Sequence, residues 1–175
     1  KDVKWQLVRV PRAAVEGWGG RIKEEWRTAL PGNQEKSLLL VAGERTFVVS
    51  RDTYRPQSYC VEPGAKAATP ITFFGGARDA VVVDDLAFIA RGLYGLTVHD
   101  LAASDQMLFV GGVSDADTTF HRVAAMPDQR QVVALTSRGL ELYAVEFAAP
   151  PPAALAGAGP PPAGRAPVLT DDGLD

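Results

Sequence analysis

The sequence predicts an all-β fold of propeller-like, four-stranded blades that form an incomplete ring, followed by a Pro-rich extended C-terminal tail. Three observations predict it. Short apolar runs alternate with turn residues, the composition changes sharply after Phe147, and the pattern recurs at a nearly constant spacing. Phe47 precedes Phe88 by 41 residues, and Gly95 precedes Gly139 by 44. A period of this length with several short strands per unit is typical of β-propeller blades.

Composition and charge exclude several classes of protein. The 175 residues are 46% hydrophobic and 22% charged, which is the composition of an ordinary globular domain. The formal net charge of -3 gives no basic surface for nucleic acid, so we expect no nucleic acid among the partners. No apolar stretch reaches the roughly 18 residues of a membrane helix, so we expect no membrane span of the chain's own.

The clearest repeat unit lies in the middle of the chain. Two β-rich runs flank Asp84-Asp85, which predicts a tight hairpin. A turn at residues 91–95 leads to a third run, and a fourth run ends at the pair Gly111-Gly112. The four runs are 80–83, 86–90, 96–100 and 107–110.

The same order of runs recurs on both sides of this unit. Upstream, the runs are 37–41, 45–50 and 58–61; downstream, they are 122–126, 131–135 and 140–145. The pairs Gly75-Gly76 and Gly111-Gly112 stand 36 residues apart. We expect both pairs at the junctions between blades, where the chain needs positive φ and close backbone approach.

Residues 76–100, GARDAVVVDDLAFIARGLYGLTVHD, closely resemble one unit of the LVIVD repeat, a bacterial propeller blade. Residues 122–145 match it fairly and residues 37–61 loosely. The resemblance implies a propeller fold without a catalytic motif, and a periplasmic or extracellular location. Full-length members have more blades than the three found here, so we expect a ring that does not close. An open arc leaves two apolar blade faces in water, which either a second copy, completing a six-bladed ring, or other subunits have to cover. The alternative is a twisted sandwich or an incomplete barrel built from the same strands.

Three regions follow from this organisation. Residues 1–36 hold a strand at Trp5 to Val10 and a short helix around Arg21 to Ala29, ended by Pro31-Gly32. Residues 37–147 form the propeller-like repeats. Residues 148–175 form a Pro/Ala-rich tail, which we expect to lie along a partner chain or along its own domain.

The sequence holds little that indicates chemistry. Cys60 lies in an apolar run and is expected to be a buried thiol. Neither His99 nor His121 has the spacing of a metal ligand, so both are expected to be structural. No hydrolase, phosphate-binding or metalloprotease motif occurs, and turn formation already explains Asp84-Asp85. We therefore predict no enzyme activity, no cofactor and no metal.

One pattern indicates a binding surface. Arginine and tyrosine recur in the turn between the second and third strands of each unit, and both residue types are favoured at protein contacts. We expect Asp79 and Asp115, on the connections between blades, to share this face. Alternatively, the arginines only pair with neighbouring aspartates. The candidate interface residues are Arg51, Tyr54, Arg55, Arg91, Tyr94 and Arg138.

Two functions are compatible with these observations. The first is a noncatalytic accessory or scaffold subunit that binds other protein subunits in an extracytoplasmic or membrane-associated assembly. The second is a part of an oligomeric propeller that binds a small sugar-like or anionic ligand, or that hosts an enzyme site on its axis.

Overall fold

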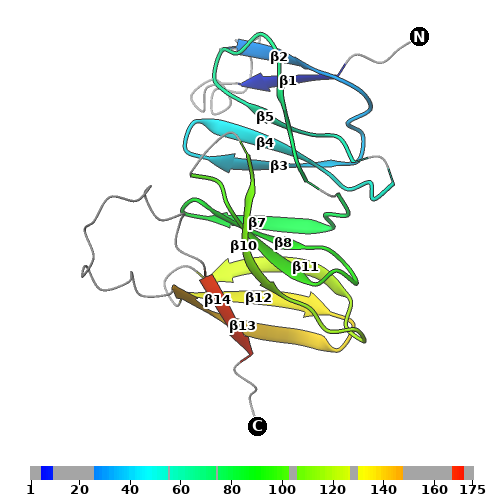
Figure 1. The fold of residues 1–175 in the computed structure, drawn as a ribbon, viewed down its shortest axis with the longest axis vertical. Helices are drawn as coiled ribbons and strands as arrows, with labels where there is room; N and C mark the ends of the chain where they lie inside the picture. Colours follow the sequence, from blue (N-terminus) through cyan, green and yellow to red (C-terminus); the bar gives the residue numbers. More distant parts are fainter. Residues whose placement is uncertain are drawn as a thin grey trace, which may run out of the picture. The chain divides into compact units, whose positions relative to one another are not determined.

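The computed structural model describes residues 5–9, 26–54, 56–73, 75–102, 106–126, 130–147 and 167–171. These ranges form antiparallel sheets and contain no helix (Figure 1). None of the sheets closes on itself. The predicted all-β class is therefore confirmed.

The chain divides into two compact units, Lys1–Gly75 and Gly76–Asp175. In the first unit, two strands form a small sheet of their own, and four more form the first four-stranded sheet in chain order. The small sheet pairs β1 (Trp5–Arg9) with β2 (Trp26–Leu30). The first sheet consists of β3 (Ser37–Ala42), β4 (Arg45–Ser50), β5 (Ser58–Val61) and β6 (Thr69–Ile71).

The predicted helix around Arg21 to Ala29 is wrong where the structure describes it, because Trp26–Leu30 is strand β2. Residues 21–25 lie outside the described residues. Tertiary packing explains the strand. Side chains of the small sheet, Leu7, Trp26 and Leu30, pack on a cluster of buried residues of the first sheet. A strand lets Trp26 and Leu30 face the cluster while the exposed residues that alternate along β2 face away. This packing outweighs the weak helical preference of a charged segment.

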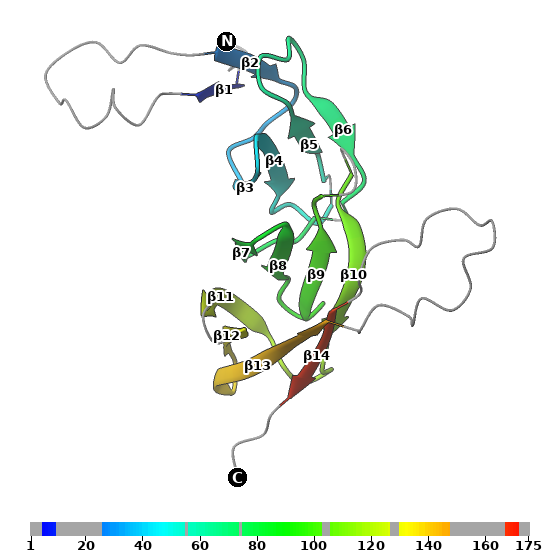
Figure 2. The same ribbon diagram turned by 90° about the vertical axis from the view of Figure 1, so that its left-hand side faces the viewer.

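The second unit holds two further four-stranded sheets, each again in chain order (Figure 2). The second sheet consists of β7 (Asp79–Val83), β8 (Leu86–Ala90), β9 (Leu96–Asp100) and β10 (Leu108–Val113). The third sheet consists of β11 (Phe120–Met126), β12 (Gln131–Thr136), β13 (Gly139–Phe147) and β14 (Pro167–Asp171).

The predicted hairpin at Asp84-Asp85 is confirmed. Val83 pairs with Leu86, so the two aspartates alone form the loop. Asp84 has a φ of 52°. Aspartate tolerates this left-handed conformation better than most residues, which explains its use here.

The two glycine pairs do not play the same role. Gly75 and Gly76 lie between β6 and β7 with positive φ, as expected for a junction. Gly111 and Gly112, in contrast, lie inside β10, where the pairing with β9 shifts by one residue. A Cβ on Gly112 would lie 2.6 Å from the carbonyl oxygen of Leu96. This glycine is needed because the neighbouring strand approaches closely, not because the strand ends.

Part of the C-terminal tail belongs to a sheet. Residues 148–166 lie outside the described residues, but Pro167–Asp171 pairs antiparallel with β13 as the fourth strand of the third sheet. This part of the tail therefore lies along its own chain, which is one of the two alternatives left open above.

The core of the second unit lies between its two sheets. Strand β11 contacts β7 and β8, and β14 contacts β10. Phe88 of the second sheet and Phe120 and Tyr143 of the third are at most 2% exposed and share one apolar cluster. The rings of Phe120 and Tyr143 lie 6.1 Å apart. The two sheets thus pack face to face.

The close approach at Gly112 can be tested by Gly112→Ala. We expect a loss of about 1–3 kcal/mol in the free energy of unfolding, because the added methyl group forces the β9 or β10 backbone to move. Urea denaturation measures this loss. Gly43→Ala is the comparison: its Cβ would meet no atom within 4 Å, so only its φ of 57° opposes the change. The loss in Gly43→Ala therefore reports only the cost of a left-handed alanine. Unchanged stability of Gly112→Ala would contradict the explanation.

Candidate functional site

The turn between β8 and β9 is the best defined of the predicted contact turns. The amide of Arg91 donates to the carbonyl of Gly95 at 2.8 Å, and the amide of Gly95 donates to the carbonyl of Gly92 at 3.2 Å. Gly92 and Gly95 have φ values of 64° and 86°. A Cβ on Gly95 would lie 2.1 Å from the carbonyl oxygen of Val113, so this position requires glycine.

Backbone hydrogen bonds fix this turn to the third sheet. The amide of Gly92 donates to the carbonyl of Phe120 at 3.0 Å, and the amide of Phe120 donates back to Gly92 at 3.0 Å. Phe120 is buried in the core at the start of β11. The packing of the two sheets therefore sets the conformation of the turn. A molecule that bound to the turn would lose little conformational entropy, because the backbone is already ordered.

Two exposed side chains project from the turn that is fixed in this way, and the partly buried Arg91 lies beside them. Leu93 is 66% exposed and Tyr94 is 61% exposed. The guanidinium carbon of Arg91 lies 5.3 Å from the centroid of the Tyr94 ring, which is a cation-π distance. Burial lowers the pKa of Arg91, and the neighbouring Tyr94 partly opposes this change. Tyrosine and arginine are among the residue types that contribute most to protein interfaces. The exposed leucine beside them adds apolar area.

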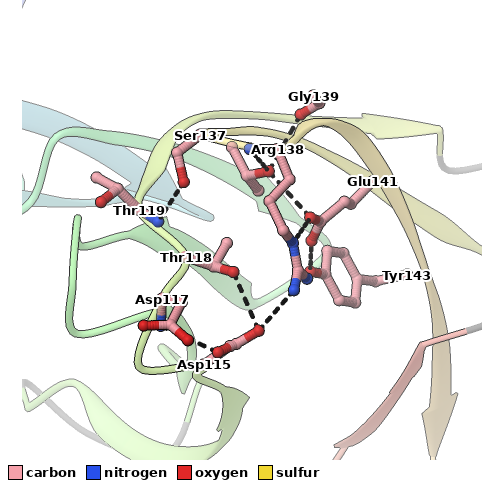
Figure 3. Close-up of polar contacts among 10 residues, drawn as sticks. Asp115, Asp117, Thr118, Thr119, Ser137, Arg138, Gly139, Glu141 and Tyr143 are labelled. Carbon is pink, nitrogen blue, oxygen red and sulfur yellow. Dashed lines mark hydrogen bonds and ion pairs between the residues drawn. The ribbon is translucent and has the colours of Figure 1, made fainter.

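Arg138, in the turn between β12 and β13, is held differently (Figure 3). Its Nη1 donates to Asp115 Oδ2 at 2.6 Å, and its Nε donates to Glu141 Oε1 at 2.9 Å. The hydroxyls of Thr136 and Tyr143 also donate to Glu141, and that of Thr118 donates to Asp115. This network ties the connection before β11 to the β12–β13 turn. Arg138 thus pairs with a neighbouring aspartate, as the alternative in the sequence analysis proposed.

The network shifts the ionisation of its members. The pKa of Asp115 is lowered, first by the amide of Asp117 and then by Thr118 and Arg138. Burial raises the pKa of Glu141, but hydrogen bonds from Arg138, Tyr143 and Thr136 outweigh it and the pKa falls. The hydrogen bond to Glu141 raises the pKa of Arg138. All three groups are charged at neutral pH, so the guanidinium of Arg138 is neutralised and hydrogen-bonded by the two carboxylates.

The two aspartates expected on connections occupy different places. Asp115 lies on the connection between β10 and β11. Asp79 is instead the first residue of β7, where its Oδ2 accepts the Val123 amide at 3.1 Å and its Oδ1 lies 3.7 Å from Arg122 Nη1. The prediction that Asp79 lies on a connection is wrong, because its carboxylate is needed where β7 meets β11.

The remaining candidates belong to the first unit. Arg51 and Tyr54 lie on the connection between β4 and β5, and Tyr54 is 94% exposed. The carboxylate of Asp52 accepts the Tyr54 amide at 2.8 Å, which shapes this connection. Arg55 lies outside the described residues. The common face predicted for all three turns joins two units that are described separately, and it stays a prediction.

His99 is a buried residue of β9, as expected for a structural histidine. It is 6% exposed, its Nε2 lies 3.2 Å from Thr97 Oγ1, and the Phe109 ring stands edge-on at 5.7 Å. The pKa of His99 is lowered to about 4, and burial is the largest cause. The positive charge of Arg91 also lowers this pKa, while a backbone hydrogen bond with Met107 opposes the shift. His99 is therefore neutral in the folded protein at neutral pH.

Cys60 is 1% exposed, which confirms the expectation of a buried thiol. Among the residues that the structure describes, no three histidine, cysteine or acidic side chains are grouped as metal ligands. In the same ranges, no helix has the length and hydropathy that a bilayer crossing requires.

The buried histidine makes folding depend on pH. Between pH 6.5 and about 4, the unfolded chain binds a proton at His99 that the folded chain does not, so the free energy of unfolding falls as the pH falls. The loss reaches at most about 3 kcal/mol at the acid end. Urea titrations across this range should give a shallower pH slope for His99→Gln than for the native chain. An identical slope would show that His99 does not ionise on unfolding.

Comparisons with protein-family models, with curated proteins and with solved structures find no match to this chain. Its resemblance to the LVIVD repeat stays a prediction from the residues quoted above.

Proposed function

We propose that the three four-stranded sheets are propeller blades in an open arc, and that the chain is a noncatalytic accessory or scaffold subunit that binds another protein. Support comes from the repeated antiparallel order of four strands and from the face-to-face packing of the second and third sheets. The resemblance of residues 76–100 to the LVIVD repeat extends the proposal to an extracytoplasmic or membrane-associated assembly.

The turn between β8 and β9 carries the proposal. Its backbone is fixed to β11 at Gly92, and it presents Leu93 and Tyr94 to solvent beside the cation of Arg91. A rigid projection with an apolar side chain and an aromatic ring suits a partner that offers an apolar recess.

Of the other candidate residues, Arg138 has a supporting role. Its guanidinium already donates to Asp115 and Glu141, so it holds the third sheet together rather than reaching a partner. The same pairing opposes the alternative of an anion-binding site at this turn, because an anion would have to displace two carboxylates.

The double variant Leu93→Ser, Tyr94→Ala tests this function. We expect it to lose at least about tenfold in affinity for the partner that purifies with the native chain, because it removes most of the exposed area of the turn. Quantitative affinity purification from the source cells identifies the partner, and titration of the purified pair measures the affinity.

Glu44→Lys is the matched control. Glu44 is exposed in the β3–β4 turn of the first unit, so this change should leave the same binding intact. Unchanged affinity in the double variant, with the fold retained by circular dichroism, would show that the turn is not the contact.

A further inference from the structure

His121 is the extra residue of a β-bulge at the start of β11. The pairing of β11 with β12 shifts between Phe120 and Arg122, and His121 lies between these two residues. A bulge of this kind re-aims a side chain. Here the imidazole of His121 meets Arg78, the residue just before β7. The two side chains meet at 3.0 Å, between Arg78 Nη1 and His121 Nδ1.

The chemistry of this contact determines the charge of His121. A guanidinium has hydrogen-bond donors and no acceptor, so the ring nitrogen Nδ1 has to accept. A ring nitrogen accepts only when it carries no proton, and both ring nitrogens carry one in the charged form. His121 is therefore neutral in this contact, with its proton on Nε2.

The same guanidinium lies against the β8–β9 turn. A Cβ on Gly92 would lie 2.7 Å from Arg78 Nε and 3.0 Å from the guanidinium carbon, so the side chain of Arg78 covers this glycine. The amide of Arg78 also donates to the carbonyl of Ala90, at the end of β8, at 2.8 Å. His121 directly follows Phe120, which exchanges two hydrogen bonds with Gly92. Arg78 thus contacts the anchor of the turn on both of its sides.

We propose that the Arg78–His121 contact makes the anchor of the β8–β9 turn sensitive to pH. Neutral His121 accepts from Arg78 and holds the anchor. Protonated His121 cannot accept, and it places a second positive charge beside the guanidinium, so the anchor loosens. A loosened turn has conformational entropy to lose on binding, and weaker binding at acidic pH follows. This last step rests on the proposed function, whereas the loosening does not.

The charges near His121 do not offset a proton on its ring. Strands β8 and β12 contain no charged residue. The carboxylate of Asp79 already contacts Arg122 and the amide of Val123, and that of Asp115 is held by Arg138. A proton on His121 therefore adds a cation to a group that is rich in arginine. The charged residues of the elements that meet here are Arg78, Asp79, Arg91, Asp115, Asp117 and Arg122.

Histidine is the side chain that changes its charge between pH 5 and 8. The chain has two histidines. The pKa of His99 is lowered to about 4, so His99 stays neutral in the folded protein through this range. Arg78 is exposed, so water screens its repulsion of a charged His121. Two unit charges about 4 Å apart in water still change an equilibrium about fivefold.

Hydrogen exchange of the Gly92 and Phe120 amides, followed by NMR on the full chain, tests the proposal. We compare the native chain with His121→Asn, because asparagine offers an acceptor oxygen close to the place of Nδ1 and binds no proton. Between pH 7.5 and 5.5, the protection factors of both amides should fall about fivefold more in the native chain. His99 is present in both chains, so its effect on unfolding cancels. An equal fall in the two chains would overturn the proposal.

Two more variants show whether Arg78 is the group that responds. Arg78→Gln removes the positive charge, so its protection factors should fall no more than those of His121→Asn. Lys36→Gln is the matched control, because it removes an exposed cation of the first unit and should keep the full fall of the native chain. Nitrogen chemical shifts of the His121 ring give a separate check. A neutral ring with its proton on Nδ1 at pH 7.5 would contradict the contact.

Partner binding separates this proposal from the proposed function. If the turn loosens at pH 5.5 as expected, but Leu93→Ser, Tyr94→Ala binds the partner like the native chain, the proposed function fails and the pH-sensitive anchor stands. If the double variant loses the partner, but the native chain and His121→Asn exchange alike, the anchor proposal fails and the proposed function stands.

Discussion

The face-to-face packing of the second and third sheets is the constraint on which the second unit depends. An antiparallel four-stranded sheet can face water on one side only if its other face finds an apolar cover. Here the aromatic rings of Phe120 and Tyr143 cover Phe88 and its neighbours. Polar contacts reinforce this packing at its edge, where Asp79 accepts the amide of Val123. Removing either sheet would expose the whole cluster.

The same packing explains why a short turn can be a binding element. A free turn of this length would sample many conformations and would lose them on binding. Gly92 instead exchanges two hydrogen bonds with Phe120, which is itself anchored in the core. Core packing thus fixes the backbone of the turn, while Leu93 and Tyr94 stay in solvent. If the turn binds a partner as proposed, stability and recognition depend on the same pair of residues.

The sequence predicted the strands and tight turns well because local patterns determine them. Asp84-Asp85 and the spacing of apolar runs need no distant contact to be interpreted. Strand β2 could not be predicted in this way, since its conformation comes from packing Trp26 and Leu30 on the first sheet. Likewise, nothing near Gly112 shows that a carbonyl of β9 will lie against it. Strand β14 pairs with β13 from far along the chain, and a Pro-rich segment between them hides the connection.

Arg91 and Arg138 show how far a recurring residue type can indicate function. Both follow the second strand of a sheet, so the sequence pattern predicts the same role for both. Their surroundings differ, because the connection before β11 brings Asp115 to Arg138, and β13 adds Glu141. Arg91 instead has an aromatic ring beside it, with its guanidinium carbon 5.3 Å from the centroid of Tyr94. Position in a repeat therefore identifies candidate residues, but the neighbours that the fold supplies decide which of them stabilise the protein and which can bind another molecule.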